Sequence, residues 1–277
     1  SHALLAYAED TTGYETYTLR LRDLRTGADL ADAIEGTAGS FEWGADDRTI
    51  FYTTVDAAHR PHKLWRHVVG SAQAEDECLL TEPDELFYLS LDKSASGRFV
   101  FATCESKETS EVHAVDLGAS RPSSAELGES APSGPPPRPA MYRVCERMPG
   151  TLYSAEHRGD HLLILTNAGG ARDFKLLTAP LGPSSQSEWA DVDQFGYDGA
   201  RTLDAVLPFR DFIAVFGREG GISRAWVIDA PAEARVPSSA RRIEFDEAAY
   251  LVGPAANKEY DAPELRLRYS SLVTPPT

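Results

Sequence analysis

Short apolar runs separated by polar turns dominate the sequence. The runs are rich in Val, Ile, Leu, Phe, Tyr and Thr, and Gly, Asp, Asn or Pro bounds them. Several alternate apolar with polar positions, as strands with one solvated face do. Only Asp29–Ile34, where an Asp could act as the cap, suggests a short helical turn. The pattern predicts an all-β protein whose clearest strands are Thr16–Leu24, Thr49–Val55, Leu64–Val69, Leu86–Leu91, Arg98–Cys104, Glu111–Leu117, Leu162–Thr166, Phe174–Thr178, Phe212–Phe216 and Ala225–Asp229.

The predicted strands recur in a fixed order. Each copy has a first strand, a turn rich in Asp, Ser or Gly, a second strand, a loop and a third strand that ends near Gly or Pro. The first strands of the four copies are Ser40–Trp43, Leu86–Leu91, Leu152–Glu156 and Leu203–Leu207. Apart from one longer step, the spacing is close to the roughly 40–50 residues of a propeller blade. We therefore expect a β-propeller with about four complete blades and partial ones beside them. A pair of β-sandwich domains is the alternative, although sandwiches do not repeat at a fixed period.

One segment explains the longer step. Residues 119–140, Ala119–Ala140, consist largely of Pro, Ser, Gly and Ala. Such a segment has little apolar surface to bury, so we expect a disordered insertion after a third strand, at the outer edge of a blade. Deletion of Pro122–Pro139 is then expected to leave folding almost unchanged. Residues 1–277 as a whole are expected to form one propeller domain that is incomplete at both ends.

Composition and charge limit the partners. The 277 residues carry 27 Lys and Arg against 43 Asp and Glu, a formal net charge of -16. This charge disfavours nucleic-acid binding and would attract basic peptides, although an acidic surface is also a means of staying soluble. No apolar stretch is long enough for a membrane span, and no signal segment opens the sequence. Cys78, Cys104 and Cys145 are odd in number and widely spaced, which favours a reducing compartment, and we expect a cytoplasmic protein.

No catalytic nucleophile is evident. The closest approach to a G-x-S-x-G elbow is Gly221–Ala225, which lacks the last glycine and lies in a predicted hairpin. Ser90 and Lys93 fit S-x-x-K by letter, but they lie at a strand end and a turn rather than on a helix. We therefore assign no catalytic residue to these 277 residues.

The histidines give no metal site either. His59, His62 and His67 lie close together in sequence, but three interleaved Arg and Lys side chains would repel a cation. We expect neither a metal nor a cofactor. In the ordinary interpretation, Leu64 and Trp65 pack inward, and the His and Arg side chains of this stretch face solvent or a neighbouring blade.

An acidic group is the one candidate for substrate contact. Glu82, Asp84 and Glu85 immediately precede the first strand of a copy. In a propeller this strand is innermost, so the three carboxylates would lie near the central channel and could attract Lys or Arg side chains. A solvated loop is the alternative.

Strings along nearly the whole chain match one family. They include Leu5–Gly13, Leu19–Gly27, Ile34–Thr37, Phe41–Gly44, Arg60–His67, Glu82–Glu85, Phe87–Leu91, Lys107–Val112 and Leu267–Pro276. Arg60–His67, which reads RPHKLWRH, is the most distinctive. With these strings the sequence resembles the propeller domain of oligopeptidase B, in the prolyl oligopeptidase family of serine peptidases.

The resemblance implies a fold and an activity. It implies a seven-bladed propeller that covers the active site of a cytosolic peptidase and admits only small or unstructured peptides. The enzyme would cut short peptides after Arg or Lys. Its catalytic Ser, Asp and His would lie in an α/β-hydrolase domain that follows in the same chain. The implied partners are therefore short basic peptides and that hydrolase domain.

The sequence departs from the family at its ends. It starts at Ser1, inside the propeller, and stops at Thr277, where the hydrolase domain is still to come. We therefore expect no peptidase activity from these residues alone, and marginal stability for an incomplete ring with open strand edges. A stand-alone propeller that binds peptides or proteins is the main alternative, and a truncated product without function is a third.

Overall fold

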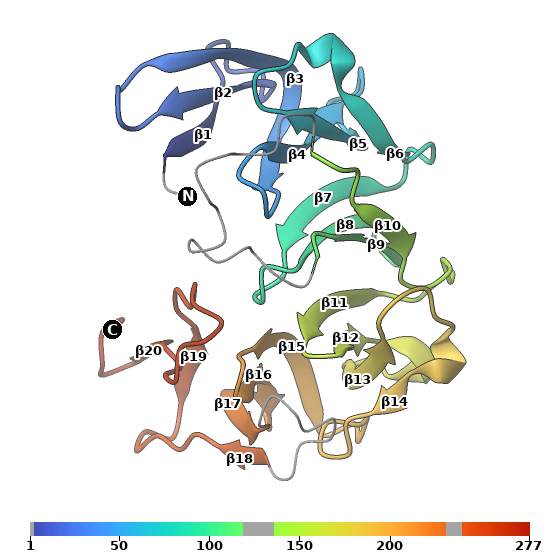
Figure 1. Cartoon of the computed structure of the whole chain (residues 1–277). Helices are drawn as coiled ribbons and strands as arrows, with labels where there is room; N and C mark the ends of the chain where they lie inside the picture. Colours follow the sequence, from blue (N-terminus) through green and yellow to red (C-terminus); the bar gives the residue numbers. More distant parts are fainter. Residues whose placement is uncertain (1–2, 119–135, 231–239) are drawn as a thin grey trace. The chain divides into compact units, whose positions relative to one another are not determined.

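The protein consists almost entirely of antiparallel sheet. The computed structural model describes residues 3–118, 136–230 and 240–277, and the strands of these residues form five sheets (Figure 1). The only helical elements of the described residues are three 3-10 turns, η1 (Gln73–Glu75), η2 (Ala168–Gly170) and η3 (Gln186–Glu188). The chain divides into two compact units. The N-terminal unit comprises residues 1–93, 97–107 and 113–142, and the C-terminal unit comprises residues 94–96, 108–112 and 143–277.

The first sheet has six strands in chain order. They are β1 (Leu4–Glu9), β2 (Tyr17–Asp23), β3 (Asp29–Trp43), β4 (Thr49–Val55), β5 (Pro61–Val68) and β6 (Glu77–Thr81). The long strand β3 pairs with β2 through its first half and with β4 through its second half, from Thr37 onward. The helical turn expected at Asp29–Ile34 is therefore wrong. The reason is that these residues alternate between exposed and buried positions, and the Asp29 carboxylate binds Arg22 instead of a helix N-terminus.

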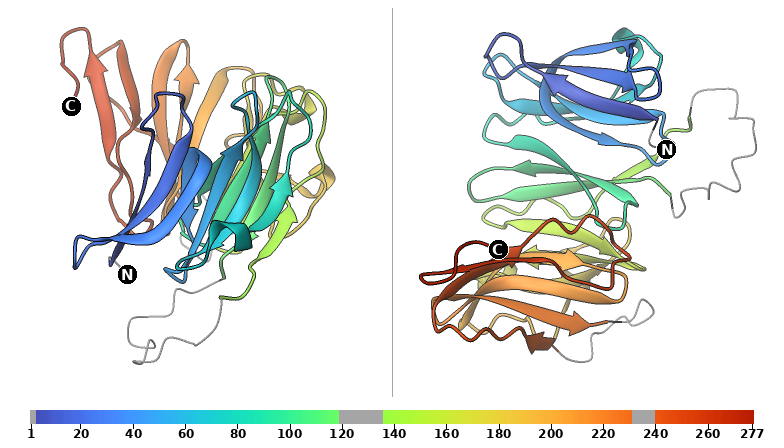
Figure 2. Two further views of the ribbon diagram at one scale, coloured as in Figure 1. Left: turned by 90° about the horizontal axis from the view of Figure 1, so that it is seen from above. Right: turned by 90° about the vertical axis from the view of Figure 1, so that its left-hand side faces the viewer.

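The remaining strands form separate four-stranded meanders and one hairpin (Figure 2). The first meander comprises β7 (Tyr88–Lys93), β8 (Phe99–Glu105), β9 (Ser110–Asp116) and β10 (Ala140–Arg143). The next two comprise β11 (Tyr153–Arg158), β12 (His161–Thr166), β13 (Lys175–Pro180) and β14 (Ala190–Asp191), and β15 (Arg201–Pro208), β16 (Phe212–Glu219), β17 (Ile222–Asp229) and β18 (Ala240–Arg242). The hairpin comprises β19 (Tyr250–Pro254) and β20 (Leu267–Ser271).

These sheets match the predicted copies, with one strand added to each. The first three strands of each meander lie where the repeat pattern predicts them. The fourth strands β10, β14 and β18 have only 4, 2 and 3 residues, too few to produce a recognisable pattern of alternation. The order and spacing of the sheets are those of propeller blades.

The Pro/Ser-rich insertion follows the third strand of its sheet, β9, and precedes the short fourth strand, β10. Residues 119–135 lie outside the described residues, so the expected disorder is not tested there. The end of the insertion is anchored: the Arg66 guanidinium donates to the carbonyl of Pro136 at 2.5 Å, and Arg138 lies 3.0 Å from Glu77. A deletion that reaches Pro139 would remove these contacts.

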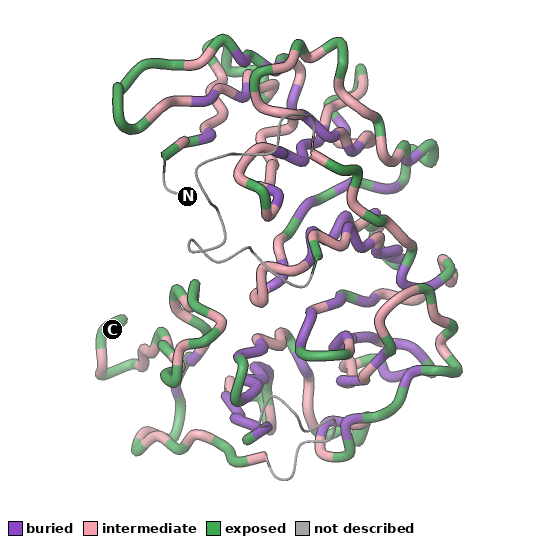
Figure 3. The backbone as a smooth tube through the Cα atoms, viewed as in Figure 1, coloured by how far each residue is buried: buried purple, intermediate pink, exposed green. Residues whose placement is uncertain are grey.

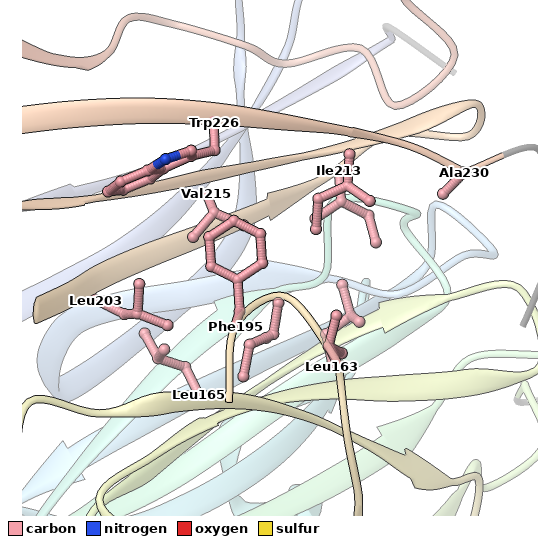
Figure 4. Close-up of a cluster of buried hydrophobic side chains, with 11 residues drawn as sticks. Leu163, Leu165, Phe195, Leu203, Ile213, Val215, Trp226 and Ala230 are labelled. Atoms are coloured by element: carbon pink, nitrogen blue, oxygen red, sulfur yellow. The ribbon is translucent and has the colours of Figure 1, made fainter. Parts of the chain in front are cut away.

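The second strand of each of the four predicted copies lies in the core. Strands β4, β8, β12 and β16 are buried on both faces over most of their length (Figure 3). In the C-terminal unit, Leu163 and Leu165 pack against Phe195, whose ring meets that of Trp226 edge to face at a centroid distance of 5.8 Å (Figure 4). The apolar runs of the sequence therefore fill the space between neighbouring sheets.

A buried arginine ties the connections of the C-terminal unit together. Arg158 ends β11, and its side chain is the largest fully buried one in the described residues. Its guanidinium donates to the carbonyl of Phe209 at 3.0 Å, to that of Arg210 at 2.8 Å and to that of Ala230. Burial lowers the pKa of Arg158. The guanidinium satisfies carbonyl groups that would otherwise lie without a donor in the core.

A buried histidine plays a comparable part in the N-terminal unit. Both ring nitrogens of His67 lie against carboxylates, Nδ1 at 2.7 Å from Asp76 and Nε2 at 2.9 Å from Asp32. Because carboxylates only accept, both nitrogens donate and the ring is an imidazolium. Tyr52 donates to Asp76 at 2.8 Å, and the amide of Gly70 donates to Asp32 at 2.6 Å. The expectation that the His and Arg side chains of Arg60–His67 face solvent or a neighbouring blade is therefore wrong for His67.

Replacement of Arg158 by alanine is expected to lower the free energy of unfolding by about 2–4 kcal/mol, because two buried carbonyl groups and one partly buried carbonyl group lose their donor. Urea unfolding followed by circular dichroism measures the change. Arg218→Ala is the matched control, since that side chain is 61% exposed, and it is expected to stay within about 0.5 kcal/mol. Equal stability of the two variants would contradict a structural role for Arg158.

The His67 network predicts a dependence of stability on pH. Burial lowers the pKa of His67, but its hydrogen bonds and charge attraction to Asp76 and Asp32 raise it by more, so the net shift is upward from 6.5. The stabilising contribution is therefore fully present below pH 6.5 and is lost as the pH rises through the raised pKa. His67→Ala is expected to cost about 3–5 kcal/mol at pH 6 and to flatten this dependence. Thermal unfolding from pH 5 to 10 measures both effects. The same pH profile in His67→Ala as in the wild type would contradict a charged His67 ring. His59→Ala, at an exposed position, is the control.

Candidate functional site

The acidic loop is organised by a buried arginine. The loop 82–87 joins β6 to β7, and the Arg60 side chain beneath it is only 7% exposed. Its Nη1 donates to the carbonyls of Asp84 at 2.9 Å and Phe87 at 2.8 Å, and the guanidinium also donates to the carbonyl of Glu82 at 3.3 Å. One side chain therefore fixes the course of the whole loop.

Arg60 is itself held by a turn. The Asp56 carboxylate, after the end of β4, accepts from the backbone amides of Arg60 and Ala58 and from Arg60 Nε at 2.9 Å. These hydrogen bonds lower the pKa of Asp56, so its carboxyl group stays ionised; the bond from the Arg60 amide has the largest effect. This role of Arg60 was not predicted from the sequence. Its position in the distinctive string Arg60–His67 was the only signal.

The three predicted carboxylates have different roles. Glu82 is buried and accepts from the amide of Asp84 at 2.9 Å, and Asp84 accepts from the amide of Leu86 at 3.0 Å. These two side chains shape the loop. Glu85 is exposed, and among the described residues its carboxylate has no hydrogen-bond or ion-pair partner. Of the three predicted site residues, Glu85 is the one whose carboxylate is bound by none of the described residues.

Two shallow cavities open beside the loop and meet at one aromatic ring. The first has a volume of about 330 Å³ and is lined by Asp56, Arg60, Glu85 and Tyr88 together with two alanines. The second has a volume of about 530 Å³ and is lined by Leu86, Tyr88, Ser90, Glu105, Ser106 and Lys107. Tyr88 and Glu105 are not among the residues predicted from the sequence. They are neighbours only through the register of β7 with β8, in which they are directly paired.

Strand β7 presents this face because it lies at the edge of its sheet. Leu89 and Leu91 point into the core, while Tyr88, Ser90 and Asp92 alternate with them and are exposed. An edge position is what the innermost strand of a blade occupies. That the acidic loop lies at a central channel stays a prediction.

The other candidate groups are structural where the structure describes them. Ser223 donates to the carbonyl of Tyr250 at 3.0 Å and accepts from the amide of Val252, so its hydroxyl joins β17 to β19. Lys93 donates to the carbonyl of Trp43 at 2.6 Å. Within residues 3–118, 136–230 and 240–277, no group of three or more His, Cys, Asp or Glu side chains could hold a metal ion.

The three cysteines are free thiols, and Cys104 and Cys145 are buried. Burial raises the pKa of the Cys145 thiol. Among the described residues, no helix has the length and apolar character needed to span a bilayer.

Comparison with known sequences identifies the fold over the full length. Residues 1–277 match the family described as the prolyl oligopeptidase N-terminal beta-propeller domain. The chain is 37% identical to Protease 2 of Moraxella lacunata over 278 residues, which cover 100% of this chain and 36% of that protein. It is 31% identical to dipeptidyl aminopeptidase BI of Pseudoxanthomonas mexicana, with coverage of 99% and 34%. The chain thus spans about a third of the length of these relatives.

Comparison with solved structures gives the same family. Oligopeptidase B from Leishmania major superposes with a TM-score of 0.83 at 31% identity, covering 100% of this chain and 37% of that one. Oligopeptidase B from Trypanosoma brucei, in a closed form with covalently bound antipain, superposes with a TM-score of 0.82 at 32% identity, with coverage of 100% and 36%. The β-propeller prediction and the family resemblance are both confirmed.

The match also accounts for the missing nucleophile, because all 277 residues correspond to the propeller and none to a hydrolase domain. The sheets, their repeat and these matches together show that the chain belongs to the prolyl oligopeptidase family, as its N-terminal β-propeller domain.

Proposed function

We propose that this propeller belongs to a serine-type oligopeptidase that hydrolyses short peptides after Arg or Lys. The observation that carries the proposal is the similarity over the whole chain to two oligopeptidase B structures, each above 30% identity with a TM-score above 0.8. The catalytic residues would lie in an α/β-hydrolase domain of the same full-length protein. The propeller would supply no chemistry of its own.

The role of the propeller would be to select and confine the peptide. A peptide held beside a catalytic centre reacts at a raised effective concentration, and a narrow entrance excludes folded proteins. The net charge of -16 favours the approach of basic peptides at low ionic strength. The three free thiols are consistent with a cytoplasmic location.

The alternative is a propeller that acts only as a binding module. It would bind basic peptides through the same acidic surface without any attached hydrolase. The two proposals differ in the activity of the full-length gene product, which a direct assay decides.

The test is to express the full-length gene product and to assay blocked fluorogenic dipeptides that end in Arg-Arg or in Gly-Pro. We expect release from the Arg-Arg substrate, inhibition by a serine-directed phosphonate, and release from Gly-Pro at least tenfold slower. The 277-residue chain assayed alone is the control and is expected to release nothing. Cleavage only of substrates with a free amino terminus would instead indicate a dipeptidyl peptidase, and absence of any hydrolysis would favour the binding module.

Variants in the acidic loop separate binding from folding. Glu85→Gln in the full-length protein is expected to lower kcat/KM for an Arg-Arg hexapeptide about two- to threefold at low ionic strength and to have no effect at about 0.5 M salt. Glu82→Gln is expected to lower the melting temperature instead, because its carboxylate is buried and bonded to the loop. Salt-independent kinetics in Glu85→Gln would leave the loop without a role in substrate capture.

A further inference from the structure

We propose that Tyr88, between Glu85 and Glu105, is a binding site for the cationic side chain of a basic peptide. This inference rests on the proposed function and deepens it. It assigns to the propeller itself a contact with an Arg or Lys of the substrate. Of the three predicted carboxylates it keeps Glu85, and it adds Tyr88 and Glu105.

The first argument is the exposure of apolar surface at one place. Leu86 is 73% exposed and Tyr88 is 58% exposed, and both line the second cavity. Tyr88 also lines the first cavity, so a ligand can reach its ring from either one. A partner that covered Leu86 and the ring would remove this apolar surface from water.

The second argument is charge, which selects the partner. Among the residues that the structure describes, neither Glu85 nor Glu105 has a hydrogen-bond or ion-pair partner. The face of an aromatic ring is electronegative, so Tyr88 and the two carboxylates all favour a cation. A purely apolar partner would desolvate these carboxylates without compensation, and an anion would be repelled.

The shape of the surface suits a long basic side chain. The methylene groups of Arg or Lys can lie on Leu86 while the charged group reaches the ring and the carboxylates. Lys107 lines the same cavity as Glu105 and is likewise without an ion-pair partner in the described part of the chain. Its positive charge opposes the binding of a cation, so removal of this charge is expected to strengthen binding.

The site is also rigid before any ligand arrives. Arg60 fixes the loop that carries Glu85, through its bonds to the carbonyls of Glu82, Asp84 and Phe87. Tyr88 and Glu105 are directly paired strand residues, and buried Leu89 anchors β7 next to the ring. Little conformational entropy is lost on binding to a surface that is already ordered. All these residues lie within the N-terminal unit.

The experiment measures binding independently of hydrolysis. The full-length protein is titrated into a fluorescein-labelled hexapeptide amide of D-arginine, which a peptidase specific for L-residues does not cleave, and fluorescence anisotropy reports the Kd. Tyr88→Phe keeps the ring face, whereas Tyr88→Leu keeps apolar surface but removes the ring. Tyr14→Leu, at an exposed tyrosine in the β1–β2 turn, is the matched control.

We expect Tyr88→Leu to weaken binding about two- to fivefold, the range that a cation–π contact at an exposed site supports. Tyr88→Phe and Tyr14→Leu are expected to bind like the wild type. Glu105→Gln is expected to weaken binding and Lys107→Gln to strengthen it, with both effects absent at about 0.5 M salt. Unchanged melting temperatures identify these effects as binding effects.

Two results would overturn the inference. If Tyr88→Leu binds as tightly as the wild type, the ring does not contact the cation. If Tyr88→Phe binds as weakly as Tyr88→Leu, the hydroxyl rather than the ring face is responsible. The proposed function fails separately, when the full-length protein does not hydrolyse Arg-Arg substrates, and the D-arginine titration does not depend on that outcome.

Discussion

The structure depends on buried guanidinium groups that pair main-chain carbonyls at the connections between strands. Sheets that pack face to face bury their connections, and strands provide no partners for the carbonyl groups there. In the N-terminal unit Arg60 bonds three carbonyls of the loop 82–87, and in the C-terminal unit Arg158 bonds those of Phe209, Arg210 and Ala230. Arginine suits this task, because its five donors lie in one plane and its charge is retained on burial.

The two arginines differ in how their charge is compensated. Arg60 Nε lies 2.9 Å from a carboxylate oxygen of Asp56, so an ion pair balances the charge of the guanidinium. Arg158 has no carboxylate within ion-pair distance in the described residues, and burial lowers its pKa. Three carbonyl dipoles compensate its charge, together with a longer-range attraction to Asp211. The loop 82–87 is thus fixed by an ion pair as well as by hydrogen bonds, and the candidate site is built on this loop.

The architecture could be predicted from the sequence because it depends on repetition. Four copies of a three-strand pattern place most of the strands, since each second strand is an apolar run buried on both faces. The fourth strands could not be found, because β14 with 2 residues has no periodicity to detect. Asp29–Ile34 suggested a helix because an Asp precedes an apolar pair, whereas pairing with β2 determines its conformation. The expectation that His67 faces solvent or a neighbouring blade is wrong because a charged ring is stable in a core only beside partners such as Asp32 and Asp76. The sequence does not show that the fold brings these residues together.

The candidate site could likewise be predicted from the sequence only in part. The sequence indicates the acidic group but cannot separate the carboxylates that bond their own loop, Glu82 and Asp84, from Glu85, which bonds nothing in the described residues. That separation requires the position of Arg60, because a loop held through its carbonyls turns some side chains inward and leaves others in solvent. The ring of Tyr88 then lies beside Glu85 through the loop and opposite Glu105 through the strand register. A net charge of -16 would attract any basic peptide, whereas an aromatic ring beside two carboxylates would favour a cationic side chain that can also stack on the ring.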